Sequence, residues 1–166
     1  MQPLILTLAL DSKNQNYFNQ LRKEYFPPER NHLDAHLTLF HNLPGHEAKI
    51  TDVLDAVGKE HEILNLYVAE VRNIGNGVAY KIESQDLVQL HKYLQQQWQP
   101  WLIPQDQHKL WPHITIQNKV EPASAVALRN NLAKNFEPFM IQGVGLSLWE
   151  YLGGPWRFIE TFLFKR

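Results

Sequence analysis

The amino-acid sequence predicts an α+β protein made of two similar lobes, each an antiparallel sheet with helices on its outer side. Of the 166 residues, 44% are hydrophobic, which is enough to bury a sizeable core. A helix, a short strand, a helix and a pair of strands follow one another twice along the chain. No low-complexity stretch or linker separates the two halves. We therefore expect one domain over residues 1–166, with lobes of about 1–83 and 84–166 that can exchange strands.

The first half is expected to open with a strand that precedes the first helix. Its elements, in order, are Leu4–Leu10, Asn14–Tyr25, Ala35–Phe40, Glu47–Lys59, Ile63–Arg72 and Val78–Glu83. Phe18 and Leu21 lie at helical spacing in the first helix, and Pro27-Pro28 ends it. The segment Gly75-Asn76-Gly77 predicts a hairpin turn between the last two strands.

The second half repeats this order without repeating the sequence. Its elements are Gln85–Trp98, Trp111–Gln117, Pro122–Asn135, Met140–Glu150 and Arg157–Phe164. Leu87, Leu90 and Leu94 form one apolar side of its first helix. Pro122 suits the first position of a helix, where the missing N–H costs little. The two strands that end the chain are expected to meet at the turn Gly153-Gly154-Pro155.

Composition excludes several classes of function. The sequence has no cysteine, so it can form no disulfide, thiolate zinc site or cysteine nucleophile. The net charge of −1 lacks the basic excess of proteins that track long nucleic acids, so any RNA contact is expected at an end or a small nucleotide. The opening apolar run is short and ends at Asp11, and no segment has the roughly 20 apolar residues that span a membrane. We expect a cytoplasmic protein with no membrane partner.

Two copies of one short pattern carry the chemistry. His36-Leu37-Thr38-Leu39 lies in the first half, and His113-Ile114-Thr115-Ile116 lies at the matching point of the second. Side chains alternate along a strand, so each histidine shares a face with its threonine, opposite a buried apolar face. A single His-x-Thr pattern is weak evidence, because it also describes a half-buried histidine beside an ordinary strand threonine. Two copies in a duplicated layout favour a functional role.

A cleft between these two strands would suit acid–base catalysis at a phosphate. Histidine has an ordinary pKa near 6.5, so one imidazole can be neutral while the other is protonated. The neutral one can take a proton from water, and the protonated one can give a proton to the leaving oxygen. The hydroxyls of Thr38 and Thr115 can donate to non-bridging phosphate oxygens. This chemistry needs no metal or other cofactor.

These motifs resemble the signature of the 2H phosphoesterase superfamily, whose best-known branch is the 2′-5′ RNA ligase/cyclic phosphodiesterase family. The resemblance spans nearly the whole chain and implies a bilobal fold with pseudo-two-fold symmetry around a central cleft. It also implies that His36 and His113 are catalytic and that Thr38 and Thr115 bind phosphate. RNA-acting members often have a basic residue directly after the second motif, where this chain has Gln117-Asn118.

Further residues are candidates for contacts with a substrate. Phe40 and Gln117 lie two residues after the threonines and are expected on the cleft face, although Phe40 could instead cap the core. Arg157 is a candidate phosphate contact, and Tyr151 and Trp156 are candidates for stacking on a nucleobase.

Other polar and aromatic residues are expected to be structural. Lys119 is taken as a surface charge. The tryptophans expected in the core are Trp98, Trp101 and Trp111. His32, His41 and His46 fit no metal-ligand spacing, and His41 should point away from His36 in a continuous strand.

The sequence therefore predicts a metal-independent phosphoesterase that opens a cyclic phosphodiester, such as the 2′,3′-cyclic phosphate of a nucleotide or RNA end. One alternative is a 2′-5′ RNA phosphodiesterase or ligase, or an enzyme acting on a cyclic phosphate of ADP-ribose. Another is a module that binds a nucleotide or RNA end without turnover. The partner is in each case a nucleotide or RNA end. The sequence does not fix the oligomeric state, and a monomer is the working expectation.

Overall fold

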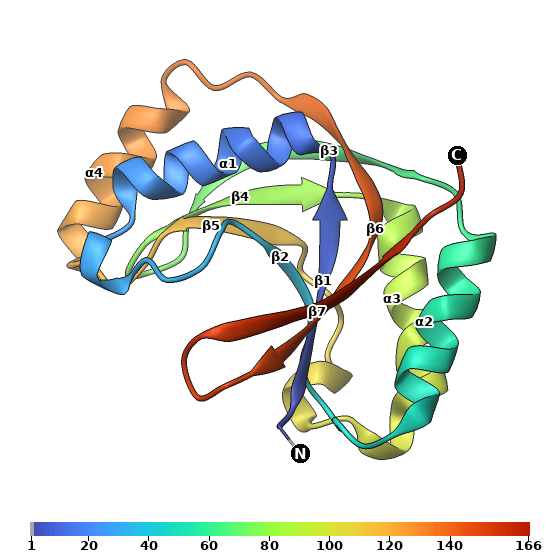
Figure 1. Ribbon diagram of the computed structural model, residues 1–166. Coiled ribbons are helices and arrows are strands. Elements are labelled where there is room, and N and C mark those ends of the chain that lie inside the picture. The colour runs from blue at the N-terminus through green and yellow to red at the C-terminus, as the bar shows by residue number, and fades with distance from the viewer. Residues whose placement is uncertain (1) are drawn as a thin grey trace.

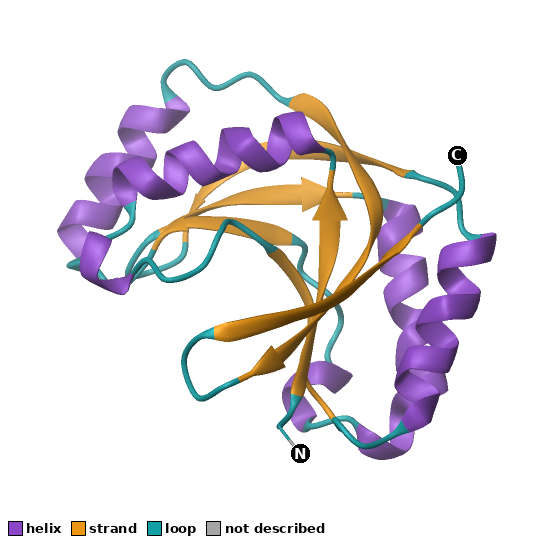
Figure 2. Ribbon diagram, viewed as in Figure 1, coloured by secondary structure: helices purple, strands orange, loops and turns teal. Residues whose placement is uncertain are grey.

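The computed structural model describes residues 2–166 as one seven-stranded antiparallel sheet with helices on its outer side (Figures 1 and 2). The strands are β1 (Leu4–Leu10), β2 (Leu37–Leu43), β3 (Leu64–Asn73), β4 (Val78–Glu83), β5 (His113–Gln117), β6 (Phe139–Tyr151) and β7 (Trp156–Leu163). Six strands follow the order β2-β1-β6-β3-β4-β5, and β7 pairs with β6. The predicted α+β class is confirmed.

The helices of the described chain cover the convex side of the sheet in two pairs (Figure 1). They are α1 (Ser12–Tyr25), α2 (Ala48–Glu60), α3 (Gln85–Trp98) and α4 (Pro122–Ala133), with short 3₁₀ turns η1 (Pro28–Arg30), η2 (Gln99–Trp101) and η3 (Pro104–Gln107). Helices α1 and α4 pack against β3, β4 and β5, while α2 packs against α3, β6 and β7. Each pair combines helices from both halves of the chain.

The sequence suggested two separate sheets, but strand β6 joins them into one. Its first part pairs with β3, and from Gly143 onward it pairs with β1 on one edge and, from Gly145, with β7 on the other. Glycine allows this crowding, because a Cβ at Gly143 would lie 2.9 Å from a methyl carbon of Leu8. A Cβ at Gly145 would lie 2.7 Å from the carbonyl oxygen of Phe162. The division of the chain into lobes near residue 83 stays a prediction.

The expected elements are all present, with ends that shift by a few residues. Helix α3 has the predicted bounds. Ser84 caps its N-terminus, because the Ser84 hydroxyl accepts a hydrogen bond from the backbone N–H of Leu87. The strand expected over residues 35–40 is β2 at Leu37–Leu43, so it reaches three residues beyond the predicted end. Within residues 2–166, every helix is too short or too polar to span a bilayer.

The curl of the sheet brings its two outermost strands together. Strands β2 and β5 are the two ends of the strand order, yet they contact each other in space. The side chains on the convex face form the core with the helices, as the fully buried Leu37 and Ile114 show. The described helices leave the concave face free (Figure 1). The polar residues of both motifs lie on this face, opposite the buried Leu37 and Ile114.

Candidate active site

The two motif histidines are held in the same way. His36 Nδ1 lies 2.8 Å from the carbonyl oxygen of Asp34, and His113 Nδ1 lies 2.8 Å from that of Trp111. A carbonyl oxygen can only accept, so in both rings Nδ1 carries the proton and Nε2 is the free nitrogen. Each imidazole is therefore fixed by the backbone two residues before it, with Nε2 available to a substrate.

Each motif histidine also packs against a tryptophan. The rings of His36 and Trp156 have centroids 4.7 Å apart, and those of His113 and Trp111 are stacked at 4.3 Å. Trp111 is 40% exposed, so it does not lie in the core as expected from the sequence. The expectation failed because the alternation of β5 extends back to this position: Pro112 and Ile114 are buried, which leaves Trp111 on the exposed side with His113.

The predicted alternation holds within both motifs. Leu37 and Ile114 are fully buried, whereas Thr38 and Thr115 are partly exposed on the opposite face. Thr38 lies directly across from Thr7 of β1. The two motifs therefore present their histidine and threonine side chains to the same concave surface.

The pairing of β2 with β1 shifts by one residue directly after the first motif. Thr38 lies opposite Thr7, but Phe40 lies opposite Leu6, so β2 carries one extra residue as a β-bulge. Opposed residues share a face, and Leu6 is fully buried. Phe40 is also fully buried, with its ring stacked on that of His91 at 4.7 Å. It does not line the cleft, contrary to the expectation from strand alternation.

Strand β5 has the matching irregularity. Thr115 lies opposite Ala79, and Gln117 lies opposite Val78, so the extra residue again follows the threonine. Val78 is fully buried and Gln117 is 7% exposed, which places the glutamine on the core face. Its Oε1 has no hydrogen-bond partner among residues 2–166. Gln117 therefore does not lie on the cleft face, contrary to the expectation from strand alternation.

The bulge in β2 also changes the position of His41. In a regular strand His41 would point away from His36, but the extra residue puts it on the face opposite Phe40, which is the cleft face. Its Nδ1 lies 3.0 Å from the carboxylate of Asp106, which is buried. Neither residue was singled out as functional from the sequence, because a bulge has no reliable sequence signal at this position.

The turn between β6 and β7 carries aromatic residues beside His36. Trp149 packs against Trp156 at 6.0 Å and against Phe158 at 5.2 Å, and its Nε1 donates to Thr7 Oγ1 at 2.9 Å. Together with Tyr151, which is opposed to Trp156 and therefore shares its face, these form what we call the aromatic wall: Trp149, Tyr151, Trp156 and Phe158.

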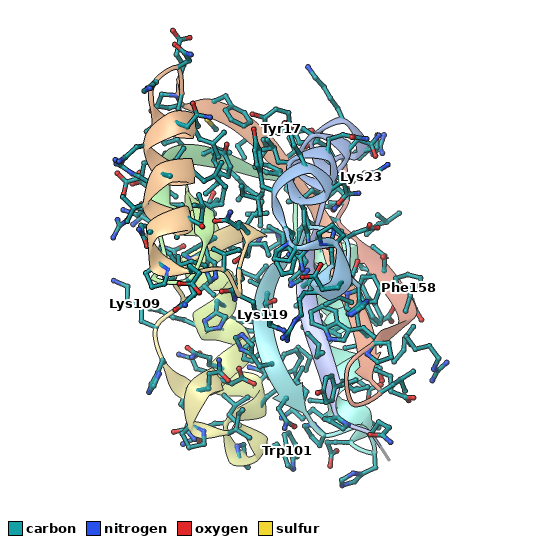
Figure 3. All side chains as sticks on the ribbon, turned by 90° about the vertical axis from the view of Figure 1, so that its left-hand side faces the viewer. Tyr17, Lys23, Trp101, Lys109, Lys119 and Phe158 are labelled. Atoms are coloured by element: carbon teal, nitrogen blue, oxygen red, sulfur yellow. The ribbon has the colours of Figure 1, made fainter. Side chains whose placement is uncertain are left out.

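A pocket of about 460 Å³ lies between the aromatic wall and the loop that precedes β2. Thr7, His36, Trp149 and Trp156 are among the residues that line it. Phe158 lies on β7 at one side of the face seen in Figure 3, and Lys119 lies near the middle of that face.

Arg157 does not belong to this pocket. It alternates with Trp156 along β7, and its guanidinium donates to Glu150 Oε2 at 3.0 Å. This exposed ion pair lies on the other face of the hairpin. Lys119 is exposed, as expected of a surface charge. Lys81 was not singled out from the sequence, but it lies directly opposite His113 and so shares its face.

The surroundings of the motif histidines favour their neutral forms. Burial, together with the positive charges of Arg22, His113 and His41, lowers the pKa of His36 to about 4. Burial also lowers the pKa of His113, and His41 adds to this effect. Both imidazoles are therefore neutral near pH 7 in the free protein. A phosphate anion between them would raise both pKa values, because it stabilises the charged form.

No group of three or more histidine, aspartate or glutamate side chains within residues 2–166 is arranged to hold a metal ion. What the site offers is two fixed imidazoles, two hydroxyls and an aromatic surface on one concave face. A curled antiparallel sheet with a histidine and a threonine at each of its two meeting edge strands is the arrangement that the resemblance to the 2H phosphoesterases implies.

Comparison with known proteins gives the family. The model of the 2′-5′ RNA ligase superfamily matches residues 10–155. The chain belongs to this superfamily. No curated protein matches the sequence.

Solved structures share the fold at low sequence identity. The structure of TT0787 from Thermus thermophilus is 15% identical with a TM-score of 0.67, and the match covers 97% of both chains. E. coli LigT complexed with 3′-AMP is 16% identical with a TM-score of 0.60, covering 99% of both chains. A structure described as a phosphoesterase is 18% identical with a TM-score of 0.61, also covering 99% of both. These likenesses confirm the predicted 2H phosphoesterase fold.

Proposed function

We propose that this protein hydrolyses a cyclic phosphodiester, such as the 2′,3′-cyclic phosphate of a nucleotide or RNA end, by acid–base catalysis between His36 and His113. The observation that carries the proposal is the matched pair of 2.8 Å contacts from Nδ1 to a backbone carbonyl oxygen. They leave two Nε2 atoms on one concave face, fixed in the same tautomer. A histidine with only a structural role would not require a second histidine held in the same way on the same face.

The reaction balances with the groups that the two motifs supply. A neutral imidazole takes a proton from water as the water oxygen bonds to phosphorus. The protonated imidazole gives its proton to the ribose oxygen as the bond from phosphorus to that oxygen breaks. Thr38 and Thr115 donate to the non-bridging oxygens, where charge builds up in the transition state. Solvent then returns the two histidines to their starting protonation states.

The aromatic wall supports a nucleotide as the substrate. Trp156 and Tyr151 share a face beside His36, where they can stack on a base while the phosphate lies between the histidines. Structures of E. coli LigT hold 3′-AMP, ATP or NADP+, so a protein of this fold accepts adenine nucleotides.

A second candidate function is cleavage or joining of a 2′-5′ linkage, favoured by the superfamily to which the chain belongs. The same four residues would serve it, because a 2′-5′ phosphodiester presents the same phosphorus to the same acid and base. A nucleotide-binding module without turnover would use the same surface. Measurable turnover would distinguish either enzyme from such a binding module.

The test is hydrolysis of 2′,3′-cyclic AMP and of a 2′-5′ adenosine dinucleotide in excess chelator. We expect turnover of the cyclic substrate that falls by about 10²-fold or more in His36→Ala and in His113→Ala, the usual contribution of one proton-transfer group. Thr38→Val and Thr115→Val should each lower kcat/KM by about tenfold. His46→Ala, at an exposed loop position, is the control and should be as active as the wild type.

The outcomes separate the candidates. Faster turnover of the dinucleotide would favour the 2′-5′ enzyme. Tight binding of the cyclic nucleotide without turnover of either substrate would favour the binding module. Turnover that survives in either histidine variant would show that the site is assigned wrongly.

A further inference from the structure

His41 is a third histidine on the concave face, and the proposed reaction does not use it. The bulge after Thr38 places it on the face opposite the fully buried Phe40, and its side chain is 48% exposed. Its charge contributes to lowering the pKa of both His36 and His113. His41 therefore lies within electrostatic reach of both motif histidines, at the strand that contacts β5.

A buried carboxylate fixes this side chain. Asp106 accepts hydrogen bonds from the backbone N–H of His41 at 2.9 Å, from the N–H of Asn42 at 3.0 Å and from His41 Nδ1 at 3.0 Å. These bonds hold the pKa of Asp106 below its usual range despite its burial, so the carboxylate is charged near pH 7. Gln95 of α3 donates to the carbonyl oxygen of Asp106 at 3.0 Å and so fixes its backbone.

This arrangement has the chemistry of an anion site. Nδ1–H is engaged by Asp106, so Nε2 is the free edge of the exposed ring. An imidazole whose far nitrogen donates to a carboxylate is oriented by it and is stabilised as a cation when an anion meets Nε2. A general acid or base is already present in each motif. The remaining task for a fixed, exposed imidazole beside a phosphate centre is to bind a second negative group.

We propose that His41, oriented by Asp106, binds a second phosphate of the substrate, so that the preferred substrate is a nucleotide with a further phosphate, as in an oligonucleotide end. This inference rests on the proposed function, because the first phosphate is placed between His36 and His113. Lys81 adds a positive charge on the same face, directly opposite His113. Two carboxylates offset part of this charge: that of Glu83, 3.4 Å from Lys81 Nζ, and that of Glu70, the other cross-strand partner of Lys81.

The test compares the binding of 3′-AMP with that of adenosine 3′,5′-bisphosphate by isothermal titration calorimetry. We expect the wild type to bind the bisphosphate about tenfold more tightly, the gain from one charge-assisted hydrogen bond. The variant His41→Asn keeps a donor for Asp106 but removes the Nε2 edge. It should bind 3′-AMP as the wild type does and lose the preference for the bisphosphate. His108→Asn, at an exposed position near Asp106, is the matched control and should keep the preference.

Each other result overturns the inference. A preference that survives in His41→Asn, or no preference in the wild type, would overturn it while leaving the proposed function intact. An equal loss of affinity for both ligands in His41→Asn would place His41 at the reactive phosphate instead. Binding of neither nucleotide by the wild type would overturn the proposed function together with this inference.

Discussion

The guanidinium of Arg22 on α1 donates from Nη1 to the carbonyl oxygen of Thr115 on β5 at 3.1 Å. Its Nε donates at 2.8 Å to Asn31, in the loop that leads to the first motif. Arg22 is buried, and its guanidinium lies 4.0 Å from the ring centroid of Phe26. One side chain thus connects the approach to His36 with the strand that carries His113.

Removing this connection should affect both stability and activity. Because buried hydrogen bonds of a charged group are worth about 1.5–3 kcal/mol each, Arg22→Lys should lower the free energy of unfolding by about 2 kcal/mol. Lysine reaches one acceptor but cannot form the fork to Thr115 and Asn31. We expect kcat for a cyclic nucleotide to fall more than KM rises, since the histidines lose their relative placement. Lys23→Ala, at the exposed neighbouring position, should change neither quantity in urea unfolding and steady-state assays.

The low pKa of His36 predicts a loss of stability in acid. The unfolded chain protonates this histidine below about pH 6.5, whereas the folded protein does so only below about pH 4. Between these values the unfolded state holds more protons, so stability falls as the pH falls. We expect a loss of about 1–3 kcal/mol from this residue between pH 7 and pH 4.

Urea unfolding of the wild type and His36→Gln at several pH values checks this expectation. Glutamine does not titrate, so the variant should show a smaller loss of stability in acid than the wild type. His91 and His113 also have lowered pKa values and will leave part of the loss in both proteins. His46→Gln, at an exposed position, should retain the full dependence of the wild type. Equal pH dependence of wild type and His36→Gln would contradict the assigned environment of His36.

The sequence alone predicts the order of the helices and strands and, from each motif histidine to its threonine, which side chains face the cleft. Apolar periodicity places the helices and strands because burial of one face dominates their stability, and His36 and Thr38 follow from strict alternation. Prediction fails where the alternation fails. A β-bulge after each threonine reverses the faces of Phe40, Gln117 and His41, and the backbone energy that selects a bulge leaves little trace in a single sequence.

Phe40 gives a direct test of this reversal. Since its ring is packed against His91 and Trp98, Phe40→Leu should lower the free energy of unfolding by about 1–2 kcal/mol through a cavity. The kcat/KM of the remaining folded protein should stay within about twofold of the wild type, because the side chain does not reach the cleft. Chemical denaturation and assays of the same samples measure both. Normal stability with weaker substrate binding would instead place Phe40 in the cleft.

The aromatic wall should account for recognition of the base, and Trp156 is its member closest to the chemistry. Stacking on one aromatic side chain is worth about 1–3 kcal/mol per base, so Trp156→Leu should weaken the binding of 3′-AMP by about tenfold or more. Inorganic phosphate has no base, and its binding should therefore be unchanged in the same variant.

Trp111→Leu is the matched comparison, because Trp111 lies against His113 as Trp156 lies against His36. A loss of 3′-AMP affinity in Trp111→Leu with none in Trp156→Leu would move the base to the His113 side of the cleft. A loss of phosphate binding in Trp156→Leu would show instead that the tryptophan supports the position of His36.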